Sequence, residues 1–322
     1  MIPAKITAIA ANTFKETIRQ PIFGIIVFLG ILIFIFSPSI TMYSIDDDNK
    51  LLRELGFSTL FLAGLFIAVF SSTGAIVEEL ENKTVMTVLT KPIPRWGFIL
   101  GKFLGLVLAV AIAHYILTVA MMFVQRHGVM STASDELDWT VITAGIITIC
   151  VSILLATLMN YISDWSFIAS SMIFMAALAT VFLGILFFID RHWQVNIQEN
   201  GLHAFDAYSS ILLFLAVTIM VAAAVLFSTR LNLVGTLLMC IAVFLLGLIS
   251  DYIFGRYADT YLWAKLGRLL VPNFQVFWIS DAIYQESKIT VSYIWKALSY
   301  AACYTAGILA LAGAAFQNRQ MS

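Results

Sequence analysis

The sequence predicts an all-α integral membrane protein with about eight transmembrane helices. Of its 322 residues, 61% are hydrophobic and only 11% are charged, and the mean hydropathy is +0.94. Soluble domains carry roughly 25% charged residues, so a water-soluble fold of this size could not bury so much apolar surface. A helix that crosses the hydrocarbon core needs about 20 apolar residues, and several stretches qualify. They cover residues 22–43, 57–77, 98–124, 140–162, 166–189, 207–228, 232–250 and 292–316.

The predicted organisation is a surface helix over residues 1–21, a transmembrane domain over 22–316 and a cytoplasmic tail over 317–322. Two pairs of spans are joined by only a few polar residues, near Asp164 and near Arg230. These pairs are predicted to form tight helical hairpins.

The segment before the first span has the pattern of an amphipathic helix. Its apolar residues recur at three- to four-residue steps, and most of the other positions are polar. Such a helix suits the inner membrane surface, with Phe14, Lys15 and Arg19 as its interfacial residues. Pro21 is expected to end it. The alternative is a simple polar leader.

The segment from Glu78 to Lys102 is longer than a loop between two spans requires. Residues 78–90 can form a short helix whose acidic start suits the helix dipole, and Pro92 and Pro94 end it. We interpret 78–97 as a cytoplasmic coupling segment, with a solvated loop as the alternative. Its predicted docking residues for an ATPase are Glu78, Glu79, Glu81, Thr84, Val85, Met86, Val88, Leu89 and Lys91.

The segment 251–291, between the last two spans, contains moderately apolar runs that are too short to cross a membrane. We predict re-entrant or interfacial helices packed against the bundle on the outer side.

Several classes of function are not indicated by the sequence. A net charge of −1 argues against a nucleic-acid partner. Cys150, Cys240 and Cys303 lie inside apolar runs, without the spacing of a metal site or a disulfide framework. The sequence Gly97 to Phe103 lacks the glycine spacing and the Ser or Thr of a phosphate-binding loop. We therefore expect no catalytic, metal or cofactor site in this chain, and any ATPase to be a separate polypeptide.

Two features inside the third span are candidates for packing or function. Gly101 and Gly105 form a G-x-x-x-G pattern that allows close helix approach, within the chain or in a dimer. His114 is an ionisable residue in the middle of the span, which marks a functional candidate, although a lone histidine more often bonds a neighbouring helix.

Taken in order, these segments resemble the ABC-2-type permease family. The resemblance rests on A-N-T-F-K-E-T-I-R-Q-P (11–21), on E-x-x-x-x-T-V-M-T-V-L-T-K-P-I-P-R-W-G-F-I-L-G-K-F-L-G (79–105) and on V-P-N-F-Q-V-F-W-I-S-D (271–281). It is closest to the branch associated with copper-enzyme maturation and gliding-motility export. One departure is the number of spans, since the family usually has six. The excess pair is expected within residues 140–206, as an addition or as a copy of the neighbouring hairpin.

The resemblance implies the membrane-spanning permease subunit of an ABC exporter in the inner membrane. Two permease copies or paralogues would pair with two cytoplasmic ATPases that bind ATP and Mg²⁺, and the chain itself would not be an enzyme. Alternatives are an ion-coupled secondary transporter, which calls for charged residues in the spans, and an integral-membrane enzyme or assembly scaffold. The uniformly apolar spans define no polar pocket, which favours a lipidic or hydrophobic cargo.

The distribution of basic residues predicts that both termini are cytoplasmic. Short cytoplasmic loops carry an excess of Lys and Arg. With the amino terminus inside, the inner segments hold Lys5, Lys15, Arg19, Lys83, Lys91, Arg95, Lys102, Arg230 and Arg319. The short outer loops hold only Lys50, Arg53, Arg126 and Arg191.

Reporter fusions test this topology. A reporter active only in the cytoplasm should be active when fused at Ser322 and inactive when inserted beside Asp47. An outward Ser322 or an inward Asp47 would contradict the eight-span arrangement.

Overall fold

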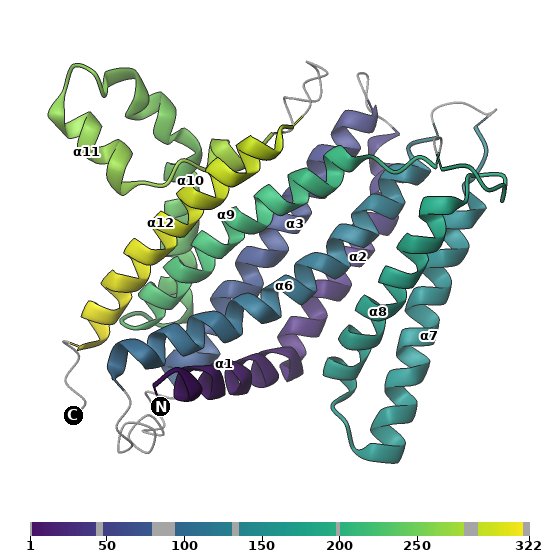
Figure 1. The fold of residues 1–322 in the computed structure, drawn as a ribbon, viewed down its shortest axis with the longest axis horizontal. Helices are drawn as coiled ribbons and strands as arrows, with labels where there is room; N and C mark the ends of the chain where they lie inside the picture. The colour runs from purple at the N-terminus through teal and green to yellow at the C-terminus, as the bar shows by residue number, and fades with distance from the viewer. Residues whose placement is uncertain are drawn as a thin grey trace. The chain divides into compact units, whose positions relative to one another are not determined.

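The computed structural model describes residues 2–42, 48–78, 94–130, 135–197, 200–279 and 289–317 (Figure 1). Most of these residues are helical, and none belongs to a named strand. The long helices are α1 (Ile2–Arg19), α2 (Pro21–Thr41), α3 (Asp48–Thr73), α6 (Arg95–His127), α7 (Trp139–Ser163), α8 (Phe167–Phe188), α9 (Ala204–Ser228), α10 (Leu233–Ile253) and α12 (Val291–Gln317). The shorter ones are η1 (Gly74–Glu78), η2 (Gly255–Tyr257), α11 (Leu262–Leu270) and η3 (Phe274–Phe277).

Within the described residues, eight helices are long and apolar enough to cross a membrane. All the long helices except α1 belong to this set, which confirms the predicted fold class. The largest shift in a boundary is at α3, which begins at Asp48, whereas the apolar stretch begins at residue 57. The placement of Lys50 and Arg53 in a loop was therefore wrong: polar first turns carry no hydropathy signal. Lys50 pairs with Glu54 at 3.5 Å, one helical turn later.

The chain forms two compact units. Unit 1 comprises Met1–Phe14, Leu65–Leu108 and Ile211–Ser322, and unit 2 comprises Lys15–Gly64 and Ala109–Ser210. The helices α1, α3, α6 and α9 each contribute residues to both units.

In unit 1, the first part of α1 packs closely on the start of α6. A Cβ atom at Gly101 would lie 2.8 Å from the side chain of Ile9, and one at Gly105 would lie 2.5 Å from the carbonyl oxygen of Ala10. Glycine is needed here because the second contact is with backbone, which cannot turn aside. Along α1, one face is buried, at Ala10 and Thr13 among others.

The end of α12 is fastened to two other segments of unit 1. Arg95, at the start of α6, donates to the carbonyl oxygen of Gln317 at 2.6 Å, and Arg230 donates to that of Ala315 at 2.6 Å. Cationic side chains at these carbonyls satisfy acceptors that have no partner within the helix. The rings of Phe98 and Phe316 stack with their centroids 5.5 Å apart.

The segment between α10 and α12, also in unit 1, packs on both helices. Gly247 of α10 faces the ring of Phe274 in η3, and Gln275 donates to the carbonyl oxygen of Leu248 at 2.8 Å. From α12, the Tyr300 hydroxyl accepts the backbone N–H of Asn273 at 2.7 Å. The helix α11 has 9 residues, too few to span, and this agrees with the predicted short helices.

In unit 2, α7 and α8 run side by side as an antiparallel hairpin (Figure 1). Asp164 closes the turn in the left-handed conformation, with φ 54°. The hairpin shares an apolar cluster with α6, composed of Val119, Phe123, Val141, Ala144, Ala179 and Leu186. Close packing continues at α2, where a Cβ atom at Gly30 would lie 2.7 Å from the side chain of Leu117.

Candidate functional site

The predicted coupling segment lies almost entirely outside the described residues. Glu78 is the last residue of η1, and Glu79, Glu81, Thr84, Val85, Met86, Val88, Leu89 and Lys91 fall in 79–93, which the structure does not describe. Its docking role stays a prediction. At the other end of this segment, Pro94 and Arg95 lead directly into α6.

The predicted interfacial residues belong to α1. Phe14 is half-buried, while Lys15 and Arg19 are exposed. Gln20 has an extended backbone and Pro21 is the first residue of α2, so the chain turns between the two helices where proline was expected to end the first.

His114 is buried in unit 2 and bonds α9. Its Nε2 lies 3.0 Å from both the carbonyl oxygen and the hydroxyl of Ser210, and the Thr118 hydroxyl lies 2.5 Å from that same hydroxyl. A buried polar group bonded in this way links two helices.

A second polar cluster, at the end of α6, is centred on a buried ion pair. The Nε of Arg126 donates to Asp138 at 3.1 Å, and the two side chains are 1% and 0% exposed. The other guanidinium nitrogens of Arg126 donate to the Leu186 carbonyl oxygen at 2.8 Å and to the Thr140 hydroxyl at 2.9 Å. One side chain therefore ties the end of α6 to the start of α7 and the end of α8.

Asp138 also caps α7. Its Oδ1 accepts the backbone N–H groups of Thr140 at 3.1 Å and Val141 at 3.3 Å. An N-cap carboxylate satisfies donors that the first helical turn leaves without partners. The carboxylate therefore has bonds on both oxygens, as a buried charge requires.

Arg191 approaches this cluster from the segment after α8. Its guanidinium donates to the carbonyl oxygens of Arg126 at 2.9 Å and His127 at 2.8 Å, and its Nε lies 3.7 Å from Asp138. Asp190 shapes the turn that carries it: its carboxylate accepts the N–H groups of Gln194 and His192, and the first of these bonds is the main reason that the pKa of Asp190 is lowered.

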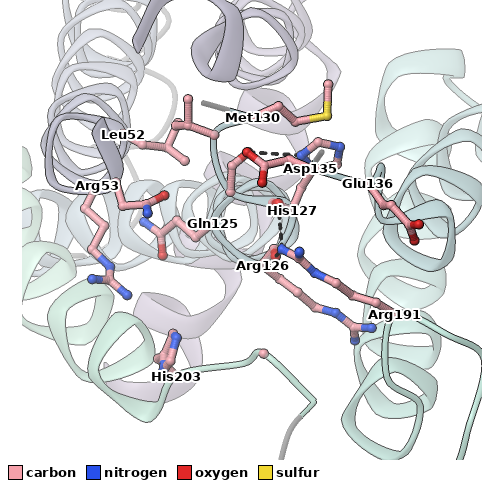
Figure 2. Close-up of a pocket in the computed structure, with 14 residues that line it drawn as sticks. Leu52, Arg53, Gln125, Arg126, His127, Met130, Asp135, Glu136, Arg191 and His203 are labelled. Atoms are coloured by element: carbon pink, nitrogen blue, oxygen red, sulfur yellow. Dashed lines mark hydrogen bonds between the residues drawn. The ribbon is translucent and has the colours of Figure 1, made fainter. Parts of the chain in front are cut away.

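These side chains border a pocket of about 520 Å³, which we call the polar pocket (Figure 2). Its lining includes Arg53, Gln125, Arg126, His127, Arg191 and Glu136. Arg53 pairs with the buried Asp206 at 3.2 Å. Gly128 and Gly201, with φ of 72° and 73°, turn the chain along its wall in a conformation that favours glycine.

A second pocket of about 490 Å³, the apolar pocket, is lined by α2, α6, α7 and the segments beside them. Phe34, Ile35, Phe123, Gly145 and Ile146 are among its residues. Two residues, His127 and Met130, line both this pocket and the polar pocket.

The polar pocket was missed by sequence reasoning. The expectation concerned the apolar spans, whereas the charges that line this pocket lie at helix ends and in the segments that join the helices. One part of the cluster could have been predicted from the sequence, because an Asp directly before an apolar run, as at Asp138, is a typical N-cap. The pairing of Arg126 with Asp138 across undescribed residues 131–134 has no such signal.

Comparison with known families gives one match. The model of the ABC-2 family transporter protein matches residues 7–163, which run from α1 through α7. No curated protein matches the chain.

The buried ion pair generates a prediction about stability. Asp138→Ala leaves Arg126 charged and buried without its carboxylate, so we expect a loss of about 3–5 kcal/mol in the free energy of unfolding. The matched control is Asp251→Ala, which removes an exposed carboxylate 3.7 Å from Arg268 and should cost less than about 1 kcal/mol. Denaturant unfolding in detergent micelles measures both, and equal losses would contradict the role of the pair.

Proposed function

We propose that this chain, which belongs to the ABC-2 family of transporter proteins, is the membrane-spanning subunit of an ATP-driven exporter. The observation that carries the proposal is the match over residues 7–163, because it includes the surface helix, the predicted coupling segment and α6 together. Permeases of this family generally work with a cytoplasmic ATPase. We infer two permease subunits, identical or paralogous, with two ATPases that supply the ATP and Mg²⁺ sites.

The packing at the start of α6 supports the transmission of motion from the coupling segment to α6 and α1. Residues 79–93 lead into α6 within a few residues, and Gly101 and Gly105 hold this part of α6 against α1. A push on the coupling segment would therefore move α6 and α1 together, because no side chain at either glycine separates the two helices.

The start of α6 also contacts the end of α12. Arg95 and Phe98 of α6 contact Gln317 and Phe316 of α12. Lys102, one turn after Phe98, is 2% exposed, with its ammonium group 5.6 Å from the centre of the Phe98 ring. A charged group held in this way adds to the rigidity expected of a segment that transmits motion.

The chain is a multi-pass membrane protein. We infer that it resides in the inner membrane with both termini in the cytoplasm, from the distribution of Lys and Arg between short loops. In this orientation the coupling segment faces the ATPase, and the polar pocket lies at the outer ends of α6 and α8. The chain itself would transport and not catalyse.

Replacement of Met86 and Leu89 by Asp tests the coupling segment. These apolar residues are predicted to fill a site on the ATPase, and two carboxylates there would be desolvated without partners. We expect the ATPase to be lost from the purified complex, or its ATP hydrolysis to become independent of the membrane subunit, while the variant still inserts in the membrane.

The control for this experiment is Val195→Asp with Ile197→Asp. These residues are also apolar, 81% and 53% exposed, and lie in the segment after α8. The control should retain the complex and its ATP hydrolysis. A Met86/Leu89 variant that behaves like the control would show that the segment is only a connector.

A further inference from the structure

The polar and apolar pockets of unit 2 adjoin each other. His127 and Met130 line both, and Leu137 of the apolar pocket follows directly on Glu136 of the polar one. Volumes of about 520 and 490 Å³ are each in the range of pockets that bind small molecules. A ligand that occupies both must have a polar end and an apolar end.

The charges of the polar pocket fall into two groups. Arg126 and Arg53 are committed to the buried carboxylates Asp138 and Asp206. Arg191 is different: its side chain is 50% exposed, and the carboxylate 3.7 Å away is already bonded to Arg126. Its two bonds, to the carbonyl oxygens of Arg126 and His127, both come from Nη2. It can therefore bind an additional anionic group.

The lining also carries negative charge. Glu136 and Asp135 are exposed at the pocket, and no ion pair of Glu136 is found among the described residues. A headgroup that carries a phosphate alone would meet this carboxylate unfavourably. One that carries a phosphate and an amine can pair with both signs of charge.

The apolar pocket is open to its surroundings along one side. Ile35 of α2 and Ile146 of α7 line it while remaining 59% and 56% exposed. Gly145, which also lines this pocket, has no atom within 4 Å of the position that a Cβ atom would take. A flexible hydrocarbon chain can enter such a pocket from the bilayer.

We propose that the two pockets together bind one phospholipid whose headgroup carries a primary amine, with the phosphate at Arg191, the amine at Glu136 and an acyl chain in the apolar pocket. The site depends only on the fold of unit 2. Its role as a cargo site rests on the proposed function, whereas a resident lipid would occupy it without turnover.

The probes are phosphatidylethanolamine, phosphatidylglycerol and phosphatidylcholine, each with a photoactivatable diazirine on one acyl chain, in vesicles of unlabelled phosphatidylcholine that contain the full-length protein. We expect phosphatidylethanolamine to label residues 31–42 and 137–149, and the other two probes to label them about tenfold less. A lost charge-assisted hydrogen bond corresponds to roughly this factor.

Two pairs of variants locate the binding. Arg191→Ala should reduce labelling about tenfold, whereas Arg268→Ala, which removes a similarly exposed arginine 3.7 Å from Asp251, should not. Gly145→Phe should fill the apolar pocket and abolish labelling. Gly184→Phe, at an exposed position of α8 that likewise has no atom within 4 Å, should leave it unchanged.

Equal labelling by the three probes, or labelling that Arg191→Ala and Gly145→Phe leave intact, would overturn the proposal. Unfolding temperatures matched between each variant and its control ensure that lost labelling reports the site. In the complex with its ATPase, labelling that falls on addition of ATP and Mg²⁺ supports a bound cargo, and unchanged labelling supports a resident lipid. If no ATPase complex forms, the proposed function fails while the lipid site stands on the labelling alone.

Discussion

The buried Arg126–Asp138 ion pair determines how unit 2 is built at the end of α6. Arg126 bonds Asp138, Thr140 and the carbonyl oxygen of Leu186. It therefore joins the end of α6 to the start of α7 and to the end of α8. A charge buried this deeply is tolerated only when its bonds are complete. The positions of both pockets follow, since α6 and α7 supply walls to the apolar one and Arg126 itself lines the polar one.

The helix α6 is fastened in a different way in each unit. In unit 1, its start lies against the backbone of α1 and the side chains of Ile9 and Thr13 through Gly101 and Gly105, and against the end of α12 through Arg95. In unit 2, its end is held by charged groups. Small residues allow close approach where the bilayer gives no hydrophobic force between helices, and a buried ion pair is tolerated where both of its charges have bonding partners.

Much of the fold could be predicted from the sequence, because spans of apolar residues give a signal that depends on composition alone. The turn at Pro21 and the tight hairpin at Asp164 also followed from local chemistry. The first turns of α3 did not, since Lys50 and Arg53 carry no apolar signal, and the contact of Arg126 with Leu186 joins helices that are distant in sequence. The G-x-x-x-G pattern was compatible with close packing within the chain or in a dimer. The packing of unit 1 shows that Gly101 and Gly105 contact α1. Pairing of helix ends is a property of tertiary structure, so the polar pocket had to be seen in three dimensions.

A double-mutant cycle on Arg126 and Asp138 tests the central interaction most directly. Arg126→Met and Asp138→Leu each leave the other charge buried, whereas the double variant leaves neither, so the free energies of unfolding should not add. If the pairing holds the helix ends together, the double variant should lose about 2–3 kcal/mol less than the sum of the two single losses. Losses that add to within about 0.5 kcal/mol would show that the two residues act independently, and would contradict the claim that their pairing holds the helix ends together.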